Sequence, residues 1–188
     1  MRQDARQNRE RILAAAEQVF GTAGAAGSTE EVARLAGVGI ATVFRHFPAK
    51  EDLVEAALLK HFDQLTEQAR ALTDGADPGT AWRDLIRTMI ETGATKLMLI
   101  SLVADGDRFP ESAAAASGRL KAAVAVVLDR AQRHGTVRPS VTVEEVYLLI
   151  RGLAQATATA QVPPGTLQRA IEVVLTGLAT PSASGDGG

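Results

Sequence analysis

The chain has 188 residues, a formal net charge of −2 and no cysteine. The absence of cysteine excludes disulfides, zinc–cysteine centres and cysteine nucleophiles. The longest apolar run, LMLI at residues 97–100, is far shorter than the ~20 residues of a membrane span, and the N-terminus has neither a signal-peptide nor a transit-peptide pattern. We therefore expect a soluble cytoplasmic protein.

The first quarter of the chain predicts three helices, over residues 8–20, about 29–36 and about 40–46. The glycine-containing segment between Gly21 and Gly27 is expected to end the first helix. Ser28 and Glu31 have the spacing of a capping box at the start of the second. Pro48 prevents the third helix from continuing.

The rest of the chain predicts further helices, over about 50–72, 80–104, 120–134, 142–161 and 167–178. The apolar segment 97–103 could be a buried helix or a strand, and we interpret it as helix because only Gly93 interrupts the helical pattern before it. Thr142 and Glu145 form a second capping box, and Gly135 is the residue expected just past a helix C-terminus. Segments 73–79 and 104–111 are predicted as a turn and a loop. We expect an all-α chain of about nine helices.

The stretch AGVGIATVFRHFPAK at residues 36–50 allows two interpretations. Glycines near threonine and lysine can form a phosphate-binding loop, but such a loop follows a strand, and no βαβ pattern is present. The same glycines can instead form the turn of a helix-turn-helix, with Gly37 in the left-handed conformation. This second interpretation is favoured, and it leaves these residues on or beside the outer face of the second short helix: Ile40, Ala41, Thr42, Phe44, Arg45 and His46.

The run STEEVARLAGVGIATVFRHFPAKEDLVEA resembles the DNA-binding domain of TetR-family bacterial transcriptional regulators. The resemblance is close over residues 8 to about 60 and extends to the rest of the chain only in layout. It implies base or phosphate contacts for Thr42, Arg45 and His46, and phosphate contacts for Thr29 and Lys50. Gly39, Ile40, Ala41 and Phe44 complete the expected DNA-binding set.

This sequence departs from the family pattern in ways that affect base recognition. Phe44 stands where a tyrosine is common, so a hydroxyl contact to phosphate is missing, and Ala49 replaces a frequent capping residue. Ile40 and Ala41 offer no hydrogen bonds. Direct readout is therefore expected to rely on Thr42, Arg45 and contacts with thymine methyl groups.

The expected domains are a DNA-binding domain over residues 1–50, with a linking helix from about 50, a helical ligand-binding and dimerisation domain over 51–180, and a disordered tail over 181–188. Small residues recur every fourth position in the helix 142–161, which permits close helix approach either within the chain or across a dimer. The family layout favours a dimer interface, for which we expect these residues: Gly152, Ala156, Ala160, Ile171, Val174, Leu175 and Leu178.

Effector-binding residues are expected among Trp82, Met89, Met98, Tyr147 and Arg151. Methionine and aromatic residues at helical spacing are more often simply part of the core. Arg151 has no acidic residue one helical turn away. It either reaches solvent or an acid on another helix, or it is available to a mostly apolar ligand with one acidic or polar end.

The sequence contains no recognisable catalytic motif. His61 and His134 have no neighbours that suggest catalysis or metal binding, and a structural role is the plainer interpretation. We expect no enzyme activity, no metal and no cofactor. The predicted protein is a ligand-responsive regulator, favoured as a repressor, that binds a palindromic operator as a homodimer. The alternative is a helical small-molecule-binding protein or enzyme whose DNA-binding segment has lost its role.

Overall fold

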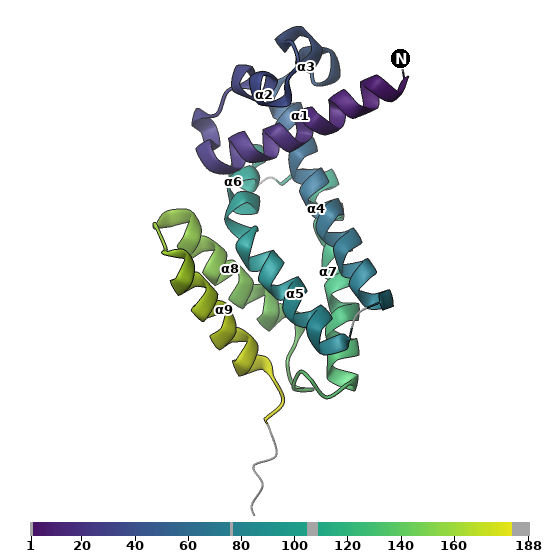
Figure 1. The fold of residues 1–188 in the computed structure, drawn as a ribbon, viewed down its shortest axis with the longest axis vertical. Helices are drawn as coiled ribbons and strands as arrows, with labels where there is room; N and C mark the ends of the chain where they lie inside the picture. Colours follow the sequence, from purple (N-terminus) through teal and green to yellow (C-terminus); the bar gives the residue numbers. More distant parts are fainter. Residues whose placement is uncertain (1, 76, 105–108, 182–188) are drawn as a thin grey trace, which may run out of the picture. The chain divides into compact units, whose positions relative to one another are not determined.

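The computed structural model describes residues 2–75, 77–104 and 109–181. Within these ranges it contains nine α-helices, one 3-10 helix and no strand (Figure 1), which confirms the predicted all-α class. The elements are α1 (Arg2–Ala23), η1 (Gly24–Ala26), α2 (Thr29–Ala36), α3 (Ile40–His46), α4 (Lys50–Gly75), α5 (Pro78–Glu91), α6 (Gly93–Val103), α7 (Glu111–Arg133), α8 (Val143–Thr159) and α9 (Pro164–Leu178).

The chain folds into two compact units. Unit 1 consists of Met1–Gln64 and Ala94–Gly118, and unit 2 consists of Leu65–Gly93 and Arg119–Gly188. Helices α4 and α7 therefore contribute residues to both units. The domain division predicted at about residue 50 falls at the start of α4.

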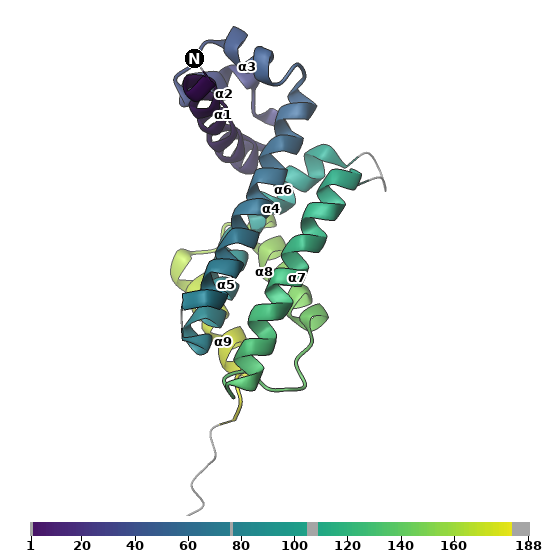
Figure 2. The same cartoon turned by 90° about the vertical axis from the view of Figure 1, so that its right-hand side faces the viewer.

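The first three helices of unit 1 pack around one apolar core. Figures 1 and 2 show α2 and α3 next to α1. The core side chains at their centre are almost completely buried: Ile12, Phe20, Val32, Val43 and Phe47. Helix α2 begins and ends where its residues predict. At its start, the Ser28 hydroxyl accepts a hydrogen bond from the Glu31 amide at 3.1 Å. At its end, Gly37 adopts a left-handed φ of +65°.

Helix α6 packs closely on the end of α1 within unit 1. A Cβ atom at Gly21 would lie 2.5 Å from Thr95 Cγ2, and one at Gly24 would lie 2.8 Å from Met98 Sδ. Gly24 also has a positive φ of +56°. Glycine at these two positions therefore permits a contact that larger residues would displace.

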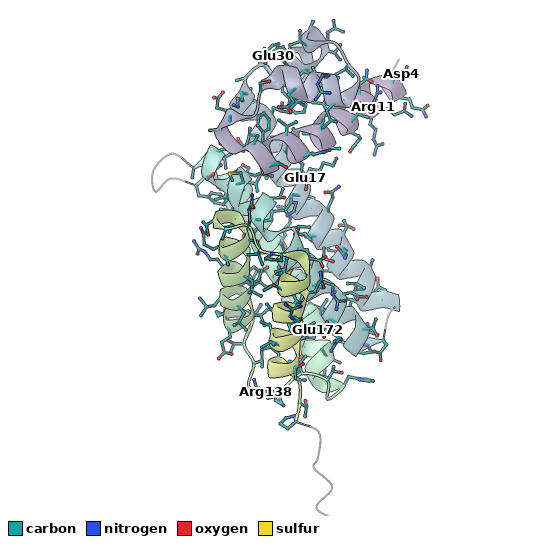
Figure 3. The ribbon with its side chains drawn as sticks, turned by 60° about the vertical axis from the view of Figure 1, so that its left-hand side comes forward. Asp4, Arg11, Glu17, Glu30, Arg138 and Glu172 are labelled. Carbon is teal, nitrogen blue, oxygen red and sulfur yellow. The ribbon has the colours of Figure 1, made fainter. Side chains whose placement is uncertain are left out.

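Unit 2 is built around α5, which contacts both α8 and α9. Figures 1 and 3 show α8 and α9 side by side. The buried core includes Trp82, Ile86, Val146, Ile150 and Ile171. Glu172, labelled in Figure 3, accepts hydrogen bonds from Arg83 at 2.5 Å and Arg87 at 2.6 Å. These ion pairs tie the exposed edge of α9 to α5.

Hydrogen bonds fix the start of α8 and the segment that follows α9 in unit 2. The predicted capping box is present: Thr142 N–H donates to Glu145 at 2.7 Å, and the Glu145 amide donates to the Thr142 hydroxyl at 3.2 Å. After α9, Ala179 forms an isolated antiparallel bridge with Val137. Arg138 adds a side-chain hydrogen bond to the carbonyl of Gly177.

The predicted element boundaries were wrong at several positions. α1 starts earlier than residue 8 and continues through Gly21 to Ala23, because the helix end is packed against Thr95. α7 begins at Glu111 rather than at about 120. Its first turns are rich in alanine and show no stripe of large apolar residues, but Ala113 and Ala116 are buried and attach them to the core. The helix predicted over 80–104 is divided at Thr92. Most of the predicted tail, residues 182–188, and residues 105–108 of the predicted loop lie outside the described residues.

Candidate nucleic-acid interface

Helix α3 presents a surface that packing within unit 1 does not use. Val43 is completely buried and anchors the helix, while Ile40, Ala41, Phe44 and Arg45 are exposed on the opposite side. The exposed fraction is 36% for Ile40 and 45% for Phe44. Three apolar side chains and one guanidinium therefore form the outward face of α3.

The other predicted members of the site are less exposed. Thr42 and His46 are half-buried, and the Thr29 side chain is buried at the start of α2. The His46 ring lies 6.3 Å from the ring of Phe47, the buried residue that ends α3. Gly39 precedes α3 in an extended conformation, and a Cβ there would meet no atom within 4 Å. The exposed surface of α3 therefore contains fewer of the predicted DNA-binding side chains than the sequence indicates.

The Lys50 side chain has partners within unit 1. Its Nζ donates to the carbonyls of Gly27 at 2.7 Å and Ala25 at 3.1 Å, and lies 5.2 Å from the centre of the Phe20 ring. Two of the three ammonium donors are therefore used to attach the η1 segment to the start of α4. This arrangement indicates a structural role for a side chain that the family resemblance assigns to phosphate.

Two arginines of α1 lie beside the helix-turn-helix and were missed by the sequence interpretation. The Arg9 guanidinium lies 5.3 Å from the centre of the Phe47 ring, next to the end of α3. Arg11, labelled in Figure 3, has a nitrogen 3.7 Å from the position that a Cβ of Gly37 would occupy. The only sequence indication was the number of basic residues near the N-terminus, where Arg2, Arg6, Arg9 and Arg11 precede Ile12, the first apolar residue of the predicted helix 8–20.

The residues expected at a dimer interface divide into two groups. Gly152 and Ala156 of α8 and Ala160, the residue that follows α8, are exposed, and a Cβ at Gly152 would meet nothing within 4 Å. Three of the α9 residues expected at the interface have side chains buried in the core of unit 2: Ile171, Leu175 and Leu178. Val174 is half-buried.

Two apolar residues that the sequence interpretation missed lie on the exposed sides of α8 and α9. Leu148 is 71% exposed and Val173 is 72% exposed. Leu148 precedes Gly152 by one helical turn, so it extends the same strip of α8. The sequence shows that Leu148 lies four residues before Gly152. It does not show that Leu148 is exposed, because that depends on how α8 packs on α5.

The residues expected to bind an effector are divided between the two units. Trp82, Met89 and Tyr147 belong to unit 2, whereas Met98 belongs to unit 1 and contacts the Gly24 region. The Arg151 side chain is exposed, so it reaches solvent, one of the two structural alternatives for this residue. Within the described residues, the buried Trp82 Nε1 and Tyr147 Oη atoms have no hydrogen-bond partner.

The histidines have no arrangement typical of metal binding. Buried His61 pairs through Nδ1 with Glu17 at 2.6 Å, joining α4 to α1, and His134 is exposed beside the end of α7. No group of three or more metal-ligating side chains occurs among the residues that the structure describes. In the same ranges, no helix is long and apolar enough to cross a membrane.

Comparisons with known proteins agree with the geometry of α2 and α3. Residues 12–57 match the family model described as bacterial regulatory proteins, tetR family. Residues 77–180 match the model described as transcriptional regulator SbtR-like, C-terminal domain. None of the curated proteins compared with the chain matches it.

Solved structures of similar proteins extend the likeness over nearly the whole chain. A TetR transcription regulatory protein from Mycobacterium vanbaalenii is 32% identical with a TM-score of 0.77, covering 95% of this chain and 99% of that one. A TetR transcriptional regulator from Streptomyces coelicolor is 27% identical with a TM-score of 0.77, covering 93% and 99%. The chain belongs to the TetR family and is a DNA-binding, ligand-responsive transcriptional regulator, not an enzyme.

Proposed function

We propose that this regulator is a homodimeric repressor that binds a palindromic operator and leaves it when a small molecule binds. The main support for the proposal is the outward face of α3, where Arg45 is exposed together with Ile40, Ala41 and Phe44. A helix of this kind enters the major groove and reads few base pairs. Two copies are therefore needed for operator specificity, and their two-fold symmetry requires a palindromic site.

The exposed side of α8 supports the dimer. Leu148, Gly152 and Ala156 follow one another at intervals of one turn, and none of them is covered within unit 2. Large exposed apolar side chains beside small residues are typical of surfaces that pack against another chain. On α9, Val173 and Gly177 are also exposed, and a Cβ at Gly177 would meet nothing within 4 Å. In a two-fold dimer, this surface would pack against its own copy.

The two unpartnered donors in unit 2 support an effector site near α5 and α8. A buried N–H or O–H without an acceptor is destabilising, and a ligand acceptor would remove that cost. Burial raises the pKa of Tyr147 above its ordinary value, so its hydroxyl stays protonated and can donate. We expect a mostly apolar ligand with a polar, hydrogen-bond-accepting end, which reaches the donors of Trp82 and Tyr147.

The effector would act through its differential affinity for two conformations. A ligand that binds better to the conformation unable to hold DNA shifts the population towards it. The exposed position of Arg151 removes the main reason for expecting an acidic ligand, because a solvated guanidinium needs no ligand counter-charge.

Selection of bound DNA from a random pool tests the DNA-binding proposal. We expect a palindromic consensus. Arg45→Ala should weaken binding by about 1–3 kcal/mol per half-site and reduce the preference at one base pair. Arg133→Ala is a matched control, because Arg133 is an exposed arginine of unit 2 paired with Asp129 on its own helix. If the wild-type protein enriches no sequence, the alternative of a small-molecule-binding protein with an inactive DNA-binding segment is favoured.

Thermal-shift screening tests the effector proposal separately. Compounds that stabilise the wild-type protein should stabilise Trp82→Phe and Tyr147→Phe less, because each variant loses one donor. Tyr147→Phe keeps the same ring, whereas Trp82→Phe keeps an aromatic side chain but also removes the five-membered ring of the indole. The same compounds should weaken binding to the selected DNA. If every stabilising compound stabilises both variants as much as wild type, these residues do not form the effector site.

A further inference from the structure

The apolar side chains of the outward face of α3 are exposed beyond what helix packing requires. Val43 and Phe47 already attach α3 to the core of unit 1 and are almost completely buried. Ile40 and Phe44 nevertheless present 36% and 45% of their surfaces to solvent. Large apolar residues that gather on one small exposed surface mark a contact site.

The helical spacing places these two side chains next to each other. Ile40 and Phe44 are one turn apart, and Ala41 and Arg45 form the adjacent pair on the same face. The outward face therefore has an apolar pair beside a pair that ends in the guanidinium. Neither the Ile40 nor the Phe44 side chain can donate a hydrogen bond to a phosphate or to a base edge.

Only one group in the major groove matches such a pair. The C5-methyl group of thymine is the apolar feature of the groove, whereas the other base-edge groups are hydrogen-bond donors or acceptors. Arginine is suited to a bidentate contact with guanine. We propose that Ile40 and Phe44 read thymine methyl groups, so that each operator half-site contains thymine beside the guanine contacted by Arg45. This inference rests on the proposed DNA-binding function.

Uracil substitution tests the inference, because uracil differs from thymine only by the missing methyl group. The duplex that the full-length wild-type protein selects from a random pool is synthesised with each thymine of one half-site replaced in turn by uracil. Loss of a contacted methyl should weaken binding about fourfold. The same scan is repeated with Ile40→Ala and Phe44→Ala, and we expect each variant to lose sensitivity at the thymine that its side chain contacts.

Leu35→Ala is the matched control. Leu35 is 42% exposed but belongs to α2, so its truncation should leave the uracil pattern of the wild-type protein unchanged. Circular dichroism melting of all three variants verifies that they are folded, as expected for exposed positions. The three variants therefore differ in the position of the lost apolar surface and not in folding.

Three results would overturn the inference while leaving DNA binding intact. One is a wild-type protein insensitive to every uracil, another is a sensitivity that persists in both α3 variants, and the third is a sensitivity lost in Leu35→Ala. Phe44→Ala that binds DNA as tightly as wild type would remove Phe44 alone from the proposed contacts. Failure of the wild-type protein to select any DNA would overturn the proposed function itself, and the inference with it.

Discussion

The outward faces of α3 and α8 are both exposed and partly apolar, but they offer different chemistry. On α3, Arg45 lies beside Ile40 and Phe44, so a fixed cation accompanies apolar contact area. On α8, Leu148, Gly152 and Ala156 themselves form a strip without charged or hydrogen-bonding side chains, and the exposed Arg151 lies beside this strip rather than in it. The first combination suits a charged polymer with distinct base edges, and the second suits close packing against an identical helix. The neighbours of an exposed apolar residue thus indicate its partner better than the exposure alone.

The largest expected effect comes from blocking the α8 strip. Gly152→Leu should produce monomers, because the added side chain occupies the space that a partner helix needs. Loss of the second half-site contact should weaken binding to a full operator by roughly 10²–10⁴-fold. Light scattering and DNA titration measure the two effects.

The chain offers a matched control for this substitution. Gly118 of α7 is also an exposed helical glycine whose Cβ would meet nothing within 4 Å. Gly118→Leu should remain dimeric and bind the operator normally, and both variants should keep their helical content, since leucine favours helix over glycine. A dimeric Gly152→Leu protein would contradict the assignment of α8 to the interface.

The next effect concerns Lys50, which attaches η1 to the start of α4. Lys50→Met removes the charge but keeps much of the apolar stem, so the carbonyls of Ala25 and Gly27 lose their donor. The free energy of unfolding should fall by roughly 1–3 kcal/mol. The salt dependence of DNA binding should not change. Denaturant titration and DNA titration at several salt concentrations measure these quantities.

Lys60→Met is the control on the same helix. The Lys60 ammonium lies 3.4 Å from the Glu10 carbonyl and 4.0 Å from its carboxylate, so its loss should cost less than about 1 kcal/mol. If Lys50→Met has normal stability but a salt slope reduced by about 0.9 per half-site, the phosphate contact implied by the family resemblance is correct.

The helix-turn-helix could be predicted from the sequence because its determinants are local. Ser28 and Gly37 fix the ends of α2 through contacts with residues three or four positions away, and Pro48 follows directly after α3. The outward positions of Ile40 and Arg45 follow from this local geometry. The partners of Lys50 could not be predicted, because they lie more than twenty residues earlier in the chain.

Unit 2 shows the opposite behaviour. The helices α8 and α9 were predicted correctly as helices, but the orientation of α9 depends on its packing against α5 about eighty residues earlier. Leu175 and Val173 are both apolar and only two residues apart, yet one is buried and the other exposed. Apolar periodicity alone could not decide which side of α9 faces the core, since both sides carry β-branched or leucine residues.

A smaller expected effect is the contribution of Arg9 of α1 to the salt dependence of DNA binding. We expect Arg9 to contact a phosphate beside the operator half-site, because its guanidinium lies next to the end of α3. Arg9→Gln should therefore lower the salt slope by about 0.9 for each phosphate lost. Arg133→Gln removes the same charge from unit 2 and should leave the slope unchanged. Equal slopes for wild type and Arg9→Gln would exclude this contact.

The smallest expected effect is the acid sensitivity of the α8 capping box. The backbone hydrogen bond from Thr142 lowers the pKa of Glu145 from its ordinary value of 4.5. A carboxylate whose pKa is lower in the folded state stabilises the protein above its ordinary pKa. That stabilisation is lost as the pH falls through the folded-state value, where the carboxylate becomes protonated.

Glu145→Gln should flatten this part of the stability profile. Glutamine can accept the same hydrogen bond from Thr142 N–H, but it does not titrate. Thermal melting between neutral pH and pH values below 4.5 should show a smaller loss of Tm for the variant than for wild type. At neutral pH the variant should be slightly less stable, because it loses the negative charge near the N-terminus of α8. Identical melting profiles at acidic pH would show that Glu145 contributes nothing to the stability of α8 through its charge.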